Sequence, residues 1–209
     1  MNASDMIHKA KVHLVMEHPF FASLALNLRP EESDKVDTLA TDGSIMLYKP
    51  TYIEGLSIEQ IKGCLAHLVL HCALGHVWRG EALEDEPRWQ KAADYATNEE
   101  LLKAGFDLPQ GYLHDKSYDK LNAEQIYTKL PPSKQQQNNQ QGKNKQPPPK
   151  GERQDITDPG KCGAVMPSST SVKEQKAKWK TETAKALMFA TQEKGELPDT
   201  LERMIRDAV

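Results

Sequence analysis

The chain has 209 residues, 38% of them hydrophobic, and a net charge of −3. This length allows one sizeable domain with appendages. The slightly negative charge gives no sign of a basic surface for binding nucleic acid, and no apolar stretch reaches the ~20 residues that span a bilayer. An odd number of cysteines (Cys64, Cys72 and Cys162) favours a reducing compartment, and without an apolar leader segment we expect a cytoplasmic protein.

Two helices are expected at the start of the chain. The first has Ser4 as its N-cap and ends before Pro19, because the residue before a proline is pushed out of the α region. The second spans Phe20 to Leu26. Next, Asp42-Gly43 separates two short apolar runs and predicts a β-hairpin, with strands at Val36–Ala40 and Ile45–Tyr48.

The next helix, about Ile58 to Trp78, is central to the sequence. Ser57 is its predicted cap, with Gln60 as the partner in a capping box. Apolar residues recur along it at steps of three and four and form one stripe: Ile58, Ile61, Leu65, Leu68 and Cys72. We therefore expect this helix to be buried along one side.

Helices also dominate the rest of the chain. One begins near Arg88 and ends at Gly105, a good C-cap, and a short one follows Asn122 as its cap. A long helix capped by Ser171 ends at Gly195, and a last helix follows it. Residues 131–154, rich in Gln, Asn, Lys and Pro, cannot bury enough apolar surface to fold.

These elements predict an α+β fold that is mainly α, with a small hairpin sheet. Its expected organisation is a domain over residues 1–130, a disordered linker over 131–154, and a C-terminal helical segment over 155–209.

His67 and His71 are four residues apart on the central helix, so their side chains lie about 40° apart around its axis. Two imidazoles with this spacing can bind one zinc ion together. Two hydrogen-bonded histidines of an apolar core would follow the same pattern, so the pair by itself leaves both interpretations open.

A catalytic zinc ion needs a third protein ligand and an open position for water. Asp94 follows His71 by 23 residues on the next predicted helix, and an antiparallel helix pair would place it opposite the histidines. His76 is about 180° around an unbroken helix from His67, and could bind only if the helix breaks at Gly75. We therefore favour Asp94 over His76.

Further residues could support such a site. Asn98 lies one helical turn beyond Asp94 and could hold a metal-binding histidine through a hydrogen bond. Imidazole with carboxylate favours zinc as the cofactor, and the same ligands suit other divalent ions.

From Pro19 to Leu130 the chain resembles the putative metallopeptidase domain that precedes a von Willebrand A-like domain in bacterial and phage proteins. The matching stretches include "PFFASLAL", "TLATDGSIMLYKPTYIEGLS", "LAHLVLHCALGHVWRG" and "RWQKAADYATNEELLKAG", and later "DPGKCGAV" and "GELPDTLERMI". The resemblance implies a zincin-like fold with His67 and His71 as metal ligands. The family's Trp-x-x-Ala-Ala-Asp pattern falls on Trp89 and Asp94, and the resemblance implies a von Willebrand A-like partner domain that this chain lacks.

One position departs from the family's His-Glu-x-x-His pattern, because Leu68 stands where the glutamate is expected. That glutamate takes a proton from zinc-bound water and later gives it to the leaving amine. Leucine can do neither, and a substitute carboxylate could come from the charged loop after the helix, which contains Glu81, Glu84, Asp85 and Glu86.

Two functions follow from this sequence. The first is a zinc-binding, metallopeptidase-like protein whose peptide hydrolysis is impaired at Leu68. The alternative is a non-catalytic pseudopeptidase that holds a peptide or protein partner or acts as a scaffold, for example by adding a peptide strand to the edge of the hairpin sheet.

Overall fold

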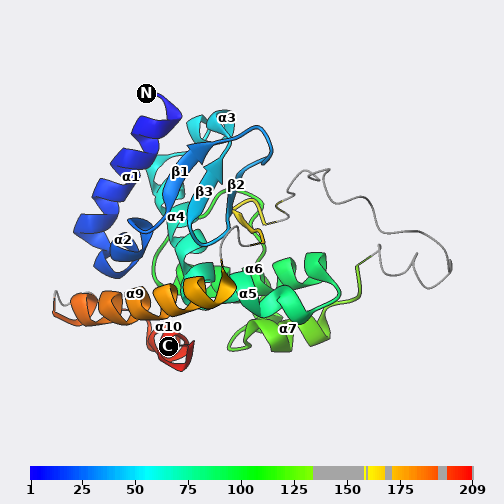
Figure 1. The fold of residues 1–209 in the computed structure, drawn as a ribbon. Helices are drawn as coiled ribbons and strands as arrows, with labels where there is room; N and C mark the ends of the chain where they lie inside the picture. The colour runs from blue at the N-terminus through cyan, green and yellow to red at the C-terminus, as the bar shows by residue number, and fades with distance from the viewer. Residues whose placement is uncertain (134–157, 159, 168–170, 193–196, 209) are drawn as a thin grey trace.

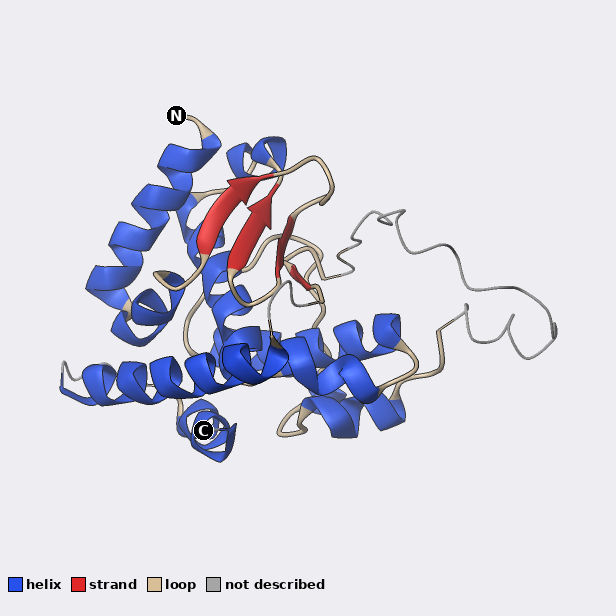
Figure 2. Cartoon of the chain, viewed as in Figure 1, coloured by secondary structure: helices blue, strands red, loops and turns tan. Residues whose placement is uncertain are grey.

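In the computed structural model, a small sheet lies beside a set of helices (Figure 1), and buried side chains from both form the main hydrophobic cluster. The structure describes residues 1–133, 158, 160–167, 171–192 and 197–208. Helices predominate and the sheet is small and mixed (Figure 2), which confirms the predicted α+β, mainly α fold.

Two helices begin the chain, α1 (Ala3–Glu17) and α2 (Pro19–Ala25). The N-cap of α1 is Asn2 and not Ser4, because the Asn2 side chain accepts a hydrogen bond of 2.8 Å from the Asp5 amide. The predicted end of α1 before Pro19 is confirmed.

The sheet has four strands in the order β1-β3-β2-β4. The predicted hairpin is present as the antiparallel pair β2 (Leu39–Thr41) and β3 (Ile45–Tyr48). Its first strand begins later than predicted, at Leu39. The remaining strands, β1 (Arg29–Glu32) and β4 (Ala164–Val165), pair in parallel with β3 and β2 and were not predicted. A polar Arg-Pro-Glu-Glu run and a two-residue strand carry no period-2 apolar signal.

After the short helix α3 (Pro50–Glu54), the central helix α4 (Ile58–Ala73) begins with the predicted capping box of Ser57 and Gln60. It ends at Ala73, so the prediction that it continues to Trp78 is wrong. The cause is Gly75, whose φ of +73° ends the helix and starts the short α5 (His76–Arg79).

Further helices follow along the chain. They are α6 (Glu86–Lys103), α7 (Ala123–Lys129), α9 (Val172–Gln192) and α10 (Asp199–Ala208), with short 3₁₀ turns at Gly80–Ala82 and Lys116–Tyr118. Helix α9 runs along α2 and α4 and buries Trp179, so the C-terminal helices join the same hydrophobic core as the N-terminal ones. The predicted disorder beyond Ser133 and the helix end at Gly195 lie outside the described residues.

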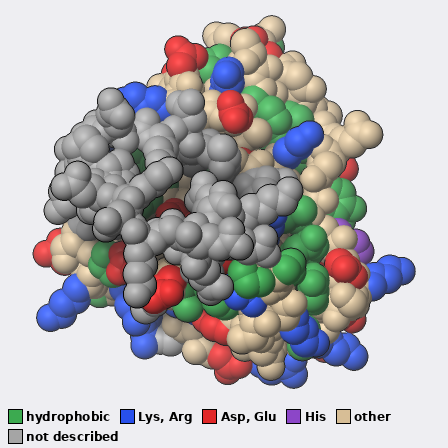
Figure 3. All heavy atoms as spheres, turned by 90° about the vertical axis from the view of Figure 1, so that its right-hand side faces the viewer, with side chains coloured by type: hydrophobic (Ala, Val, Ile, Leu, Met, Phe, Trp, Pro, Cys, Tyr) green, Lys and Arg blue, Asp and Glu red, His purple; other side chains and the backbone are tan. Residues whose placement is uncertain are grey.

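The surface carries both signs of charge. On the face shown in Figure 3, acidic and basic side chains are interspersed with hydrophobic ones. Among the described residues, no helix is both long and apolar enough to cross a membrane.

Candidate metal centre

Three buried side chains converge where α4 packs against α6. His67 and His71 come from successive turns of α4, and Asp94 faces them from α6. The Nε2 atoms of the two histidines are 2.9 Å apart, and Asp94 Oδ1 lies 3.5 Å from His67 Nε2 and 3.3 Å from His71 Nε2. One donor atom from each residue lies within 4.8 Å of the other two, an arrangement that could hold a metal ion.

Asp94 Oδ1 is the atom that best fits a metal. It is buried and has no hydrogen-bond partner among the described residues, although it faces two imidazole nitrogens. A buried carboxylate oxygen without a partner is costly, and a divalent cation between these three atoms would satisfy it. The donor set of two imidazoles and one carboxylate also matches catalytic zinc sites.

The protonation of the three groups is coupled. Burial by itself would raise the pKa of Asp94, and its contacts with His67 and His71 outweigh this and lower it. Burial likewise opposes the charged form of His67, yet the Asp94 carboxylate raises the pKa of that imidazole. Burial and the neighbouring His67 lower the pKa of His71 to about 4, so His71 is neutral at pH 7, the form in which histidine binds a metal.

The far nitrogens of both imidazoles are also held. His67 Nδ1 lies 2.8 Å from Asn98 Oδ1, as expected for a residue that orients a metal ligand. His71 Nδ1 lies 3.2 Å from His76 Nδ1. The helix does break at Gly75, but the break places His76 behind His71, on the side away from Asp94 Oδ1.

The site is covered by a segment that sequence reasoning did not place there. Asp158 Oδ2 accepts hydrogen bonds of 2.6 Å from Thr38 Oγ1 and 2.7 Å from the Gly163 amide. The Gly163 carbonyl oxygen then lies 3.2 Å from His67 Nε2. Gly160 lies against the Asp94 carboxylate so closely that a Cβ there would be 2.4 Å from Oδ2. The only sequence signal was the glycine-rich "DPGKCGAV", which indicates close backbone approach without saying to what.

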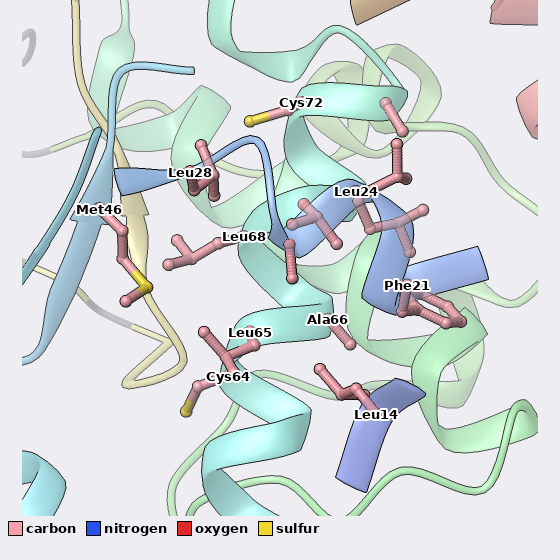
Figure 4. Close-up of a cluster of buried hydrophobic side chains, with 14 of the residues drawn as sticks. Leu14, Phe21, Leu24, Leu28, Met46, Cys64, Leu65, Ala66, Leu68 and Cys72 are labelled. Carbon is pink, nitrogen blue, oxygen red and sulfur yellow. The ribbon is translucent and has the colours of Figure 1, made fainter. Parts of the chain in front are cut away.

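Leu68 belongs to the hydrophobic core. It is fully buried, and in Figure 4 its side chain points from α4 toward the side of the sheet where Met46 lies. A Cβ on Gly163 would be 2.5 Å from Leu68 Cδ2, so the covering segment packs directly on this leucine. Among the candidate substitute carboxylates, Asp85 is the N-cap of α6 and accepts from the amides of Arg88 and Ser133. The other three are exposed: Glu81, Glu84 and Glu86.

The three cysteines behave as small core residues. Cys64, Cys72 and Cys162 are free and buried, and burial raises the pKa of each thiol. None of them belongs to the cluster of donor atoms at His67.

A separate cavity of about 540 Å³ lies between the end of α4 and helices α7, α9 and α10. None of the three donor residues lines this cavity. Five basic side chains do: Arg79, Lys120, Lys176, Lys180 and Arg203.

The mainly helical fold, the small mixed sheet and the His-His-Asp cluster between two helices fit a zincin-like metallopeptidase site. A family model described as "Putative metallopeptidase domain" matches residues 2–209, and the chain belongs to this family. No curated protein and no solved structure matches the chain.

Proposed function

We propose that this protein binds one zinc ion through His67, His71 and Asp94 and that its hydrolysis of peptide bonds is impaired. The observation that carries the proposal is the convergence of two Nε2 atoms on a buried Asp94 oxygen that has no hydrogen-bond partner among the described residues. Zinc bound there would polarise a carbonyl group and activate water.

Each residue of the metal centre has its own role in this proposal. His67, oriented by Asn98, and His71 would supply the two imidazole nitrogens, each in its neutral form. Asp94 supplies the negative charge. Leu68 cannot move a proton, and general acid–base catalysis contributes typically about 10²–10⁴-fold.

The metal is tested by zinc content after purification and dialysis against trace zinc. We expect about one zinc per chain in the wild type and close to none in His67→Ala and His71→Ala. His114→Ala is the matched control, because His114 pairs with Glu99 outside the cluster. A wild type without zinc, or histidine variants that keep it, would contradict the proposal.

The catalytic part is tested by zinc-dependent cleavage of casein. The wild type should be no faster than His67→Ala. Leu68→Glu should exceed Leu68→Gln, which has the same length but offers no base. A wild type with strong zinc-dependent activity would refute the impairment, and equal rates for the two Leu68 variants would refute the role given to that position.

A second candidate is a non-catalytic module that holds a peptide or protein partner. The observation that favours it is the complete burial of Leu68 in the core, which suits a helix retained for packing. Zinc binding without any gain of activity in Leu68→Glu would support this candidate.

A further inference from the structure

The segment Gly160–Met166, here called the strap, crosses the metal centre and is fixed to elements on both sides of it. At its start, the Asp158 carboxylate accepts hydrogen bonds from Thr38 Oγ1 and from the amides of Gly160 and Gly163. At its end, the Gln90 side chain donates from Nε2 to the Val165 carbonyl and accepts at Oε1 from the Val165 amide. Both ends of the strap are therefore held by side chains that lie next to the site.

The Gly163 carbonyl oxygen lies from His67 Nε2 at the distance expected between two ligand atoms of one zinc ion. Ligand atoms that share a tetrahedral zinc at about 2.0–2.1 Å lie about 3.3 Å from one another. The three donor atoms are separated by 2.9, 3.3 and 3.5 Å, and the Gly163 oxygen is 3.2 Å from His67 Nε2. In a catalytic zinc site the fourth ligand position is left to water or substrate.

The strap also takes the place of an added strand. Residues Ala164 and Val165 pair in parallel with Ala40 and Thr41 at the edge of β2, and the Met166 amide donates to the Thr41 carbonyl at 2.9 Å. An extended peptide that bound by strand addition would need the same row of backbone groups. Peptide binding at this edge and the observed strap therefore exclude each other.

We propose that the strap closes the metal centre, with the Gly163 carbonyl held beside His67 Nε2 and β4 in the place of a bound peptide. The proposal rests on zinc binding by His67, His71 and Asp94. It makes the resting site a closed one of structural type, in which the strap must leave before a peptide reaches the metal.

The test is the rate at which 1,10-phenanthroline removes zinc from the loaded protein. Gln90→Ala removes both hydrogen bonds to Val165 and should speed removal about tenfold or more, since two hydrogen bonds are lost from the closed state. Gln175→Ala is the matched control, because Gln175 is also a buried glutamine and its side chain donates to Ser44 Oγ of the hairpin instead of to the strap. Its rate should equal that of the wild type.

A second measurement uses the cobalt-loaded protein and acetohydroxamic acid, with visible absorbance as the readout. We expect no spectral change in the wild type and binding in Gln90→Ala. If Gln90→Ala fails to fold, Thr38→Val serves instead, because it removes the bond to Asp158.

The outcomes separate the two proposals. A wild type that holds no zinc overturns both of them. Two results in a zinc-binding wild type overturn the strap proposal alone. One is an equal rate of zinc removal from Gln90→Ala and the wild type, and the other is ready binding of acetohydroxamic acid to the cobalt-loaded wild type. Faster removal in Gln90→Ala, with Gln175→Ala unchanged, supports it.

Discussion

Replacing Gly163 with alanine tests the contact between the strap and the central helix. Gly163 has a φ of +129°, a conformation that costs a residue with a side chain about 1–3 kcal/mol. The new Cβ would lie 2.5 Å from Leu68 Cδ2 and 3.0 Å from its Cγ, and overpacking of this kind costs about 1–3 kcal/mol more. We therefore expect Gly163→Ala to lower the free energy of unfolding by about 2–6 kcal/mol.

The matched control is Gly105→Ala, because Gly105 has a φ of +82° and nothing within 4 Å of the added Cβ. This variant should lose only the backbone contribution, about 1–2 kcal/mol. Both variants gain the same small benefit from a stiffer unfolded chain, so that effect cancels in the comparison. Urea unfolding followed by tryptophan fluorescence, with and without zinc, gives both values. Equal stabilities of Gly163→Ala and Gly105→Ala would refute the packing of the strap on Leu68.

Three further outcomes are expected. Asn98→Ala should weaken zinc binding about 10–100-fold in a competition titration, because His67 loses the partner that orients it, and unchanged affinity would contradict that role. The hydrogen bond from buried Lys62 lowers the pKa of Glu17, so the stabilisation by Glu17 is present above its unfolded pKa of about 4.3 and is lost as the pH falls through the lower folded value. The melting temperature of Glu17→Gln should therefore be lower than that of the wild type at pH 7 and approach it below pH 4. A difference in melting temperature that stays constant with pH would show that Glu17 and Lys62 do not act this way. Trp179→Ala should cost about 3–5 kcal/mol in urea unfolding, because this buried ring anchors α9 to the core, and a loss below 1 kcal/mol would mean that α9 is only loosely attached.

The parts of the fold that were predictable are those encoded within a few residues of one another. Ser57 and Gln60 are three residues apart and form the predicted capping box, and Asp42 with Gly43 marks the hairpin. The spacing of His67 and His71 likewise guarantees that they share a flank of α4. Asp94 could be placed only by assuming that the next helix folds back against α4, and the structure does bring α6 into contact with α4.

The features that were missed depend on contacts between distant segments. Thr38 and Asp158 are 120 residues apart, and Gln90 and Val165 are 75 apart. No local propensity encodes such a pairing, and a strand of two residues is too short for a periodic signal. The end of α4 was missed for a different reason, because an isolated glycine is tolerated in many helices and Gly75 gave no other sign of the break.

The distance along the chain between the histidines and the strap has a consequence for biosynthesis. Gly163 follows His67 by 96 residues, so a ribosome that adds about 5–20 residues per second reaches it roughly 5–20 s later. Helices α4 and α6 are both complete well before then. In the later part of that interval, after Asp94 has been added, the nascent chain has all three donor side chains but no strap over them, and a metal ion could enter an open site that the strap closes afterwards.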